Sequence, residues 1–410
     1  MIKLAGLLAA GMAVTVCTGS AFGQSPRPAA VSSSVPITPA AIPAPTVPAA
    51  AKNPPADIPD ILETLQNRYT SLFDKISPAV VRVNAAIPSS TPGAPDIAYV
   101  WTGFFVSKNG DILTTHAHDL QNASRVWILC GDIAYTAEVK GLDPVTDVAL
   151  LQVVRLPNDS TMPKEFPALD LADSPDLPKL GSMLLAVTCK EGQMPGPSRG
   201  DLQGYNSKVG NRVLPTLHLR TTIPADGGED GSPVVDLQGR LVGIMVASLK
   251  ESRESIVLPT RAALRVRDDL LTTGKVAYGH LGFAGEQHSD SATGVRELVN
   301  SVEYGGPAGT ADLKIGDQII QLGNTTITNE DDMRQAAFYL RPNQDVTVGV
   351  LRDGQQIQLT LHVGEMQLAA EPAQPPPATA ATTPKPNISA ASLLPDAPNP
   401  ALPPPPVVQK

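Results

Sequence analysis

The sequence predicts a mostly β fold that is bordered at both ends by proline-rich segments. Between residues 97 and 154, short apolar runs alternate with tight turns, and Asn109-Gly110 is a two-residue hairpin signal. A further apolar strand follows the glycine-rich turn at 228–233, and two apolar runs meet at Asp353-Gly354. Short antiparallel strands joined by tight turns are therefore expected to form most of the framework.

The proline content separates the arms from the globular part. Of the 41 prolines in 410 residues, 10 lie within 24–60 and 13 within 367–410, among Ala, Ser, Thr and Val with few charges. Such segments bury little surface and favour extended coil, so we expect Pro/Ala-rich disordered arms over 24–57 and 367–410. The remaining residues suffice for two ordinary domains.

Residues 1–23 are predicted to be a signal peptide. Lys3 precedes an apolar run from Leu4 to Cys17, which is shorter than a membrane-spanning helix and is followed by the small-x-small pattern Ala21-Phe22-Gly23. The expected location is the periplasm or cell envelope, with no stable membrane span after cleavage. A lipoprotein carrying a lipid on Cys17 and an uncleaved anchor are the alternatives.

The net charge of −9 bears on the possible partners. The chain has 31 Lys and Arg against 40 Asp and Glu, and the basic residues form no cluster. Nucleic acids and anionic membrane surfaces attract basic patches, so we expect neither as a partner.

The turn Gly228-Glu229-Asp230-Gly231-Ser232-Pro233 is the most informative motif. Trypsin-fold proteases present their nucleophile in a Gly-x-Ser-Gly-[Gly/Ser]-Pro turn, in which glycines let backbone N–H groups line the oxyanion site. Pro233 and Gly239 have the spacing of the HtrA/Deg branch, which this segment resembles. In that register Asp230 holds the serine position, and Ser232 falls on the second glycine.

Two further segments carry the same resemblance to the HtrA/Deg serine proteases. It implies that His118, after Ala117, is the general base and that Asp147, in Thr-Asp-x-Ala-Leu, is its orienting carboxylate. The hairpin before His118 holds one residue more than usual, so His116 is a rival. The oxyanion hole would use the N–H groups of Gly228 and Asp230.

The resemblance also implies the domain plan. A trypsin-like double six-stranded β-barrel would occupy 58–260, with a linker helix at 261–277 and an α+β PDZ domain at 278–366. Residues 184–187 would be a strand of the second barrel, and 190–213 would form a long regulatory loop.

The resemblance bears on assembly and on the cysteines as well. A helix is expected within 58–73, where Tyr69 and Phe73 are candidate contacts of a homotrimer. Cys130 and Cys189 would lie in different barrels, as two buried thiols or as a disulfide.

The PDZ resemblance is carried by Leu313-Lys314-Ile315-Gly316-Asp317, which turns into an apolar strand, and by Gly279 to Phe283. PDZ domains add an extended peptide as a strand, and a loop holds its terminal carboxylate. That loop maps to His280, Leu281, Gly282 and Phe283. Unfolded polypeptides or hydrophobic C-terminal peptides are the expected partners. A helix is expected at 329–340, with Met333, Ala337 and Leu340 on one face.

Asp230 changes the expected chemistry, because a carboxylate has no proton to transfer to an imidazole and cannot act as the serine does. The main hypothesis is a catalytically inactive envelope scaffold, chaperone or regulator of proteolysis without a cofactor. In it His118, flanked by Asp147 and Asp230, would be protonated near neutral pH. The first alternative is an active serine endopeptidase that uses Ser232.

The second alternative is a metal site. Its side chains are of the kinds that ligate zinc or iron, but no pair has a recognised metal spacing. They are His116, His118, Asp119, Asp147 and Asp230.

Overall fold

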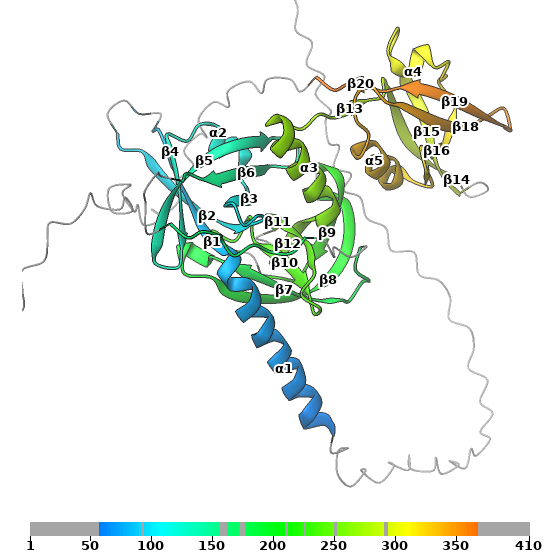
Figure 1. The fold of residues 1–410 in the computed structure, drawn as a ribbon. Coiled ribbons are helices and arrows are strands. Elements are labelled where there is room, and N and C mark those ends of the chain that lie inside the picture. The colour runs from blue at the N-terminus through cyan, green and yellow to red at the C-terminus, as the bar shows by residue number, and fades with distance from the viewer. Residues whose placement is uncertain are drawn as a thin grey trace, which may run out of the picture. The chain divides into compact units, whose positions relative to one another are not determined.

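The structure is a computed structural model, and it describes residues 57–367 apart from 90, 92–93, 156–161, 172–176, 210–211, 225, 250–251 and 291–293. The predicted signal peptide and almost all of both proline-rich arms lie outside the described residues. Two closed β-barrels and a smaller mixed domain follow one another along the chain (Figure 1). The predicted fold class is confirmed.

The first barrel contains six antiparallel strands in the order β1-β2-β3-β6-β5-β4. The predicted hairpin lies between its second and third strands, but its connection is longer than a two-residue Asn-Gly turn: the Gly110 N–H donates to Ser107 O, and Gly110 (φ 98°) has a positive φ whereas Asn109 does not. The strands are β1 (Val80–Ile87), β2 (Ile97–Phe105), β3 (Asp111–Thr115), β4 (Arg125–Cys130), β5 (Ile133–Asp143) and β6 (Val148–Val153).

The second barrel closes in the order β10-β11-β12-β9-β8-β7. Its first strand contains the predicted strand 184–187, and its fourth strand begins at Pro233, where the glycine-rich turn ends. The strands are β7 (Met183–Thr188), β8 (Gly196–Val209), β9 (Arg212–Thr221), β10 (Pro233–Asp236), β11 (Leu241–Leu249) and β12 (Glu254–Pro259).

The predicted loop at 190–213 is wrong for most of its length. After the short 3-10 helix η2 (Lys190–Gly192), this segment forms β8, which pairs with β7 and continues into β9. One of its glycines has a packing role, because a Cβ on Gly200 would lie 2.3 Å from the backbone nitrogen of Ile223. Glycine here permits a close backbone approach and does not mark a loop.

Three helices flank the barrels. Helix α1 (Asp57–Ile76) contains the predicted helix and continues into the 3-10 helix η1 (Ser77–Ala79); α2 (Ala117–Gln121) is a single short helix after β3; and α3 (Thr260–Thr273) ends at Gly274 in the left-handed conformation (φ 74°). A glycine is the usual residue at such a helix end, because it has no Cβ to clash in this conformation.

Tyr69 is only 8% exposed and belongs to the core beneath α1, so the structure places it inside this chain's own packing. Phe73 packs against the same core.

The last domain is a mixed domain of the predicted PDZ type. Its main sheet follows the order β14-β15-β16-β18-β19, and its core includes Ile319, Val348 and Leu361. The elements are β13 (Gly279–His280), β14 (Phe283–Asp290), β15 (Gly294–Val302), α4 (Pro307–Thr310), β16 (Gln318–Leu322), β17 (Thr325–Thr326), α5 (Glu330–Phe338), β18 (Asp345–Arg352), β19 (Gln355–His362) and β20 (Gly364–Glu365).

Local sequence signals account for two features of this domain. Asn329 caps α5, because its side-chain oxygen accepts a hydrogen bond from the backbone N–H of Asp332 at 2.9 Å. The hairpin of β18 and β19 turns at Asp353-Gly354, as predicted. The PDZ helix and hairpin are both confirmed.

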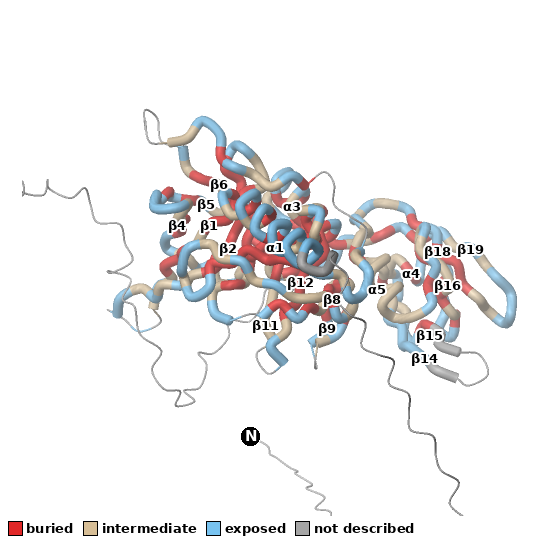
Figure 2. The backbone as a smooth tube through the Cα atoms, turned by 90° about the horizontal axis from the view of Figure 1, so that it is seen from below, coloured by how far each residue is buried: buried red, intermediate tan, exposed pale blue. Residues whose placement is uncertain are grey.

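Buried backbone is concentrated in the barrel strands and in the centre of the PDZ sheet (Figure 2). Tyr278, where the PDZ segment begins, donates a hydrogen bond from its hydroxyl to Asp143 Oδ2 at 2.6 Å. Asp143 also accepts hydrogen bonds from the backbone of Val145 and Thr146. This buried carboxylate thus fixes the turn that carries Asp147.

Candidate catalytic cleft and peptide groove

The 228–233 turn is held against β2 by its glycines. Gly228 and Gly231 have φ of 86° and 87°, and a Cβ on Gly231 would lie 2.0 Å from the carbonyl oxygen of Thr102. The turn bonds Thr102 at two points: the Thr102 N–H donates to Asp230 O at 3.0 Å, and its hydroxyl donates to Gly228 O at 2.8 Å. Only glycine fits at 231 without moving the backbone.

Ser232 points into the protein. The residue is fully buried, and its hydroxyl donates to the carbonyl oxygen of Glu229 at 2.5 Å. Glu229 is itself buried and contacts the Asp226 backbone N–H and the Thr188 hydroxyl. Burial raises the pKa of this carboxyl, against the lowering effect of the Asp226 hydrogen bond. The only serine of the turn is thus engaged in holding the turn together.

The Asp230 side chain is 21% exposed and contacts residues of both barrels. Its Oδ1 accepts a hydrogen bond from the Ser248 hydroxyl at 3.2 Å, and its Oδ2 lies 3.5 Å from Nε2 of His116. At this separation the second contact is an ion pair rather than a short hydrogen bond. A carboxylate occupies the position that the resemblance assigns to the nucleophile, and it faces an imidazole.

His116 is the histidine with two carboxylates beside it. Its Nδ1 lies 3.2 Å from Asp119 Oδ2, and its ring stacks on Trp101 with centroids 4.6 Å apart. Burial alone lowers the pKa of His116, but contacts with Asp119 and Asp230, together with the charge of Asp147, raise it to about 9. The ring is therefore an imidazolium at neutral pH.

His118 contacts the other predicted carboxylate. Its Nδ1 lies 3.2 Å from Asp147 Oδ1, which is the separation expected for a base and its orienting acid. Sequence reasoning placed His118 between Asp147 and Asp230, whereas the contact with Asp230 is made by His116. The physical reason is the backbone of His116, which has the left-handed conformation (φ 67°) and places the ring against Trp101 and Asp230.

A cavity of about 270 Å³ adjoins Asp147 and Ser248. Its walls include Val246, Leu249 and the buried His218, whose Nδ1 lies 2.8 Å from Thr216 O. Burial lowers the pKa of His218 to about 4, so this ring is neutral. The cavity is lined mainly by apolar side chains and lies beside Asp147.

The metal alternative finds no support in the described part of the chain, where no group of three or more His, Cys, Asp or Glu side chains could hold a metal ion. Cys130 and Cys189 are both free thiols, and burial raises the pKa of Cys189 to about 12. A thiol with so high a pKa is a poor nucleophile.

The predicted carboxylate-binding loop runs from β13 into β14. His280 pairs with Gly364, and its Nε2 lies 2.6 Å from Glu303 Oε2. The carbonyl oxygens of Leu281 and Gly282 accept hydrogen bonds from Ala308 and Glu303. Gly282 has a φ of 74°, and a Cβ there would lie 2.8 Å from Pro307. The loop is thus tied to the residues preceding and forming α4.

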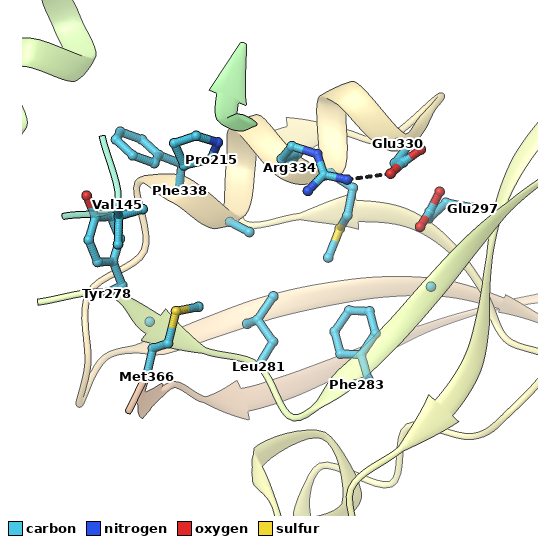
Figure 3. A pocket seen from close by; sticks show the side chains of 14 residues that line it. Val145, Pro215, Tyr278, Leu281, Phe283, Glu297, Glu330, Arg334, Phe338 and Met366 are labelled. Carbon is cyan, nitrogen blue, oxygen red and sulfur yellow. Dashed lines mark hydrogen bonds and ion pairs between the residues drawn. The ribbon is translucent and has the colours of Figure 1, made fainter. Parts of the chain in front are cut away.

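A groove of about 390 Å³ lies along β14 and α5, and it is also lined by Val145 and Pro215 of the barrel domain (Figure 3). Leu281 and Phe283 project into it from one side, while Met333 and Ala337 belong to α5. The groove also contains three charged side chains that sequence reasoning missed: Glu297, Glu330 and Arg334. Gly285 of β14 is the sequence feature that could have indicated this, because a glycine within a strand often leaves space for the side chain of a neighbouring strand.

Two family profiles match the chain. The trypsin-like peptidase domain matches residues 101–244, and the PDZ domain matches residues 279–363. The fold and these matches define the class: a trypsin-like peptidase domain followed by a PDZ domain.

The curated relatives make the assignment more specific. A probable periplasmic serine endoprotease, DegP-like, from Pseudomonas fluorescens is 31% identical over 279 residues, or 64% of this chain and 56% of the relative. The serine endoprotease DegS of Haemophilus influenzae is 27% identical over 70% of this chain and 85% of its own length. The chain spans just over half of that DegP-like relative.

Solved structures show the same fold. The HtrA-type protease AlgW with a tripeptide has a TM-score of 0.60 at 23% identity, covering 73% of this chain and 98% of that one. The serine endoprotease from Yersinia pestis has a TM-score of 0.53 at 24% identity over 73% of this chain. The predicted resemblance to the HtrA/Deg proteases is confirmed: the chain contains a trypsin-like peptidase domain and a PDZ domain, and its curated relatives are named DegP-like and DegS serine endoproteases.

Proposed function

We propose that this chain is an exported HtrA-like protein that binds peptides without cleaving them, as a scaffold, chaperone or regulator of proteolysis in the cell envelope. The observation that carries the proposal is the Asp230 carboxylate, 3.5 Å from the imidazole of His116 at the nucleophile position. Within this proposal His118, Asp147 and Asp230 are the remnant triad, with Gly228 and Asp230 at the former oxyanion hole.

The chemistry of amide hydrolysis supports inactivity. A serine hydroxyl gives its proton to the imidazole and attacks the carbonyl, and backbone N–H groups hold the developing oxyanion. A carboxylate attack would produce a mixed anhydride that lies uphill of the amide. Asp230 also places negative charge beside an anion site, and its contact with His116 occupies an imidazole that could otherwise act as a base.

The PDZ groove supports the binding half of the proposal. A C-terminal peptide would add as a strand beside β14, with its carboxylate at the loop of His280, Leu281, Gly282 and Phe283. The apolar side chains of Leu281, Phe283 and Met333 favour an apolar last residue. The ligands would be hydrophobic C-terminal peptides or exposed segments of unfolded polypeptides.

The names of the curated relatives favour a second candidate, an active serine endopeptidase for misfolded envelope proteins. In this chain that function would require Ser232, whose hydroxyl is buried and bonded to Glu229 O. Reaching the cleft would require the turn to unfold from β2. The geometry therefore favours the inactive candidate.

Location and assembly are part of the proposal. The DegP-like relative is named a probable periplasmic serine endoprotease, which fits the predicted signal peptide at 1–23. Within the described residues, none of the helices combines the length and apolar character needed to cross a bilayer. A homotrimer would use the exposed face of α1, where Ile61 and Leu62 are more than 60% exposed.

Cleavage of unfolded casein by the purified chain tests the catalytic half. We expect no cleavage by the native protein, by Ser232→Ala or by the isosteric control Asp230→Asn. Asp230→Ser restores a hydroxyl, and we expect a gain of roughly 100-fold or more over the native background. Cleavage by the native chain that disappears in Ser232→Ala would establish the protease candidate instead.

Binding of labelled peptides with an apolar C-terminal residue tests the other half independently. We expect saturable binding to the native chain and to Asp230→Asn alike, and loss of binding when the peptide C-terminus is amidated. Equal binding of the acid and the amide would contradict the PDZ assignment of function.

A further inference from the structure

Glu297 is a buried carboxylate in the peptide groove. The residue belongs to β15 and is only 4% exposed, yet it contributes to the groove lining (Figure 3). Its Oε2 makes no hydrogen bond with any group among the described residues. A buried carboxylate oxygen without a donor is costly, so a ligand that supplies a donor gains affinity.

Gly285 lets this carboxylate reach the groove. A Cβ at position 285 would lie 2.3 Å from Glu297 Oε1, so any larger residue would displace the side chain. The pairing of β14 with β15 shifts between Ala284 and Gly285, which indicates a bulge at the same place. Because Gly285 has no side chain and the strand is bulged at this point, the Glu297 side chain of β15 can reach a ligand that is bound along β14.

The other charged groups of the groove are paired with one another. Glu330 contacts Arg334 through one oxygen and Lys208 Nζ at 2.6 Å through the other. Burial raises the pKa of Glu297, the Glu330 charge adds to that rise, and Arg334 and Lys208 oppose it. Glu330 is therefore hydrogen-bonded to two cations of the protein, whereas Glu297 Oε2 has no hydrogen-bond donor among the described residues.

The register of a bound strand indicates which ligand residue meets Glu297. Leu281 and Phe283 lie at the start of β14, where the last residue of a C-terminal peptide would sit. Side chains on one face of a strand recur every second residue, about 6–7 Å apart. The next side chain directed into the groove is therefore the third from the peptide's end, opposite Gly285 and Glu297.

We propose that the groove selects C-terminal peptides with Lys or Arg as the third residue from the end, held by the Glu297 carboxylate. This inference rests on the proposed peptide-binding function and adds the ligand class. A cation supplies several N–H donors and removes the penalty of burying an unpaired acid.

Fluorescence anisotropy with the full chain tests the selectivity. Four peptides share an apolar last residue and differ only at the third residue from the end, which is lysine, norleucine, glutamine or glutamate. We expect lysine to bind about 10-fold more tightly than norleucine, with glutamine between them and glutamate weakest. In Glu297→Gln, which keeps the shape of the side chain, lysine and norleucine should bind within about twofold of each other.

Glu286→Gln is the matched control. Glu286 is the next residue of β14 after Gly285; it is exposed and is not among the groove-lining residues. Its replacement by glutamine changes the net charge by the same amount as Glu297→Gln. We expect this variant to keep the native preference for lysine. If Glu286→Gln and Glu297→Gln lost the preference for lysine equally, the preference would depend on net charge alone, and the proposed role of Glu297 would be wrong.

The outcomes separate this inference from the function on which it rests. Carboxylate-dependent binding of all four peptides with equal affinity would overturn the role of Glu297 and leave peptide binding intact. A lysine preference that persists in Glu297→Gln would do the same. Failure of every peptide, or equal binding of amidated forms, would overturn the proposed function itself.

Discussion

The barrel cleft and the PDZ groove each contain a carboxylate at a position where ligands would be expected, but the two carboxylates differ in their partners. Asp230 contacts a cationic imidazole and a hydroxyl of its own chain. Glu297 Oε2 has no donor within the described residues. A carboxylate that is already paired within the protein gains little from a ligand. A buried carboxylate oxygen without a donor gains a hydrogen bond when a ligand supplies one.

The glycines beside these carboxylates differ in the same way. Gly231 faces a backbone carbonyl that cannot move independently of β2, whereas Gly285 faces the end of a flexible side chain. The 228–233 turn therefore has no room for a larger residue at position 231. At position 285 the Glu297 side chain can move aside. Substitutions at the two glycines should differ strongly in their effect on stability.

The largest effect is expected for Gly231→Ala. The new Cβ would lie 2.0 Å from Thr102 O, and φ of 87° is unfavourable for alanine. We expect a loss of at least about 4 kcal/mol of unfolding free energy in urea, or failure to fold. Gly227→Ala is the control, since nothing lies within 4 Å of a Cβ there, and it should cost less than about 1 kcal/mol.

The next effect is a pH dependence centred on His116. Its pKa of about 9 in the folded protein exceeds the ordinary 6.5, so the stabilisation is complete below about pH 6.5 and is lost as pH rises through 9. The difference corresponds to roughly 3 kcal/mol. The unfolding free energy of the native chain relative to His116→Asn should fall over this range. A ring that titrates near 6.5 by NMR would contradict the imidazolium assignment.

A smaller loss is expected for Asp230→Asn at pH 7. The amide keeps the shape and can still accept the Ser248 hydrogen bond, but it removes one of the charges beside His116. Because Asp119 remains, we expect a loss of about 1–2 kcal/mol in urea unfolding, with a lowered His116 pKa. Unchanged stability together with an unchanged pKa would show that the pair contributes nothing.

The smallest effect on stability is expected for Gly285→Ala. Only the Glu297 carboxylate must move, so the unfolding free energy should change by less than about 1 kcal/mol. The preference for a lysine-containing peptide should nevertheless disappear, because the acid no longer reaches the groove. A loss of stability as large as that of Gly231→Ala would contradict the contrast between the two glycines.

Local signals predicted much of the framework. Asp353-Gly354 forms the two-residue hairpin turn that it predicts, the hairpin at Asn109-Gly110 is present with a longer connection, and Asn329 caps a helix. These features depend on backbone preferences of a few adjacent residues, which a sequence displays directly. The β8–β9 hairpin was missed because Gly200 permits a close approach to Ile223, which local composition cannot reveal.

The site was harder to predict, because its contacts are set by tertiary structure. The sequence pointed to His118, Asp147 and Asp230, but the partner of Asp230 depends on the left-handed backbone of His116 and its stacking on Trp101. Glu297 reaches the groove only because β14 and β15 are paired with a bulge. Neither contact follows from periodicity or from spacing along the chain.

The catalytic inactivity of the native chain is tested most directly by asking whether any of its serines is an activated nucleophile. The native chain and Asp230→Ser are incubated with a serine-reactive fluorophosphonate, and the modified residue is located by mass spectrometry. We expect no adduct on the native chain and an adduct at position 230 of the variant. An adduct on Ser232 of the native chain would contradict this expectation.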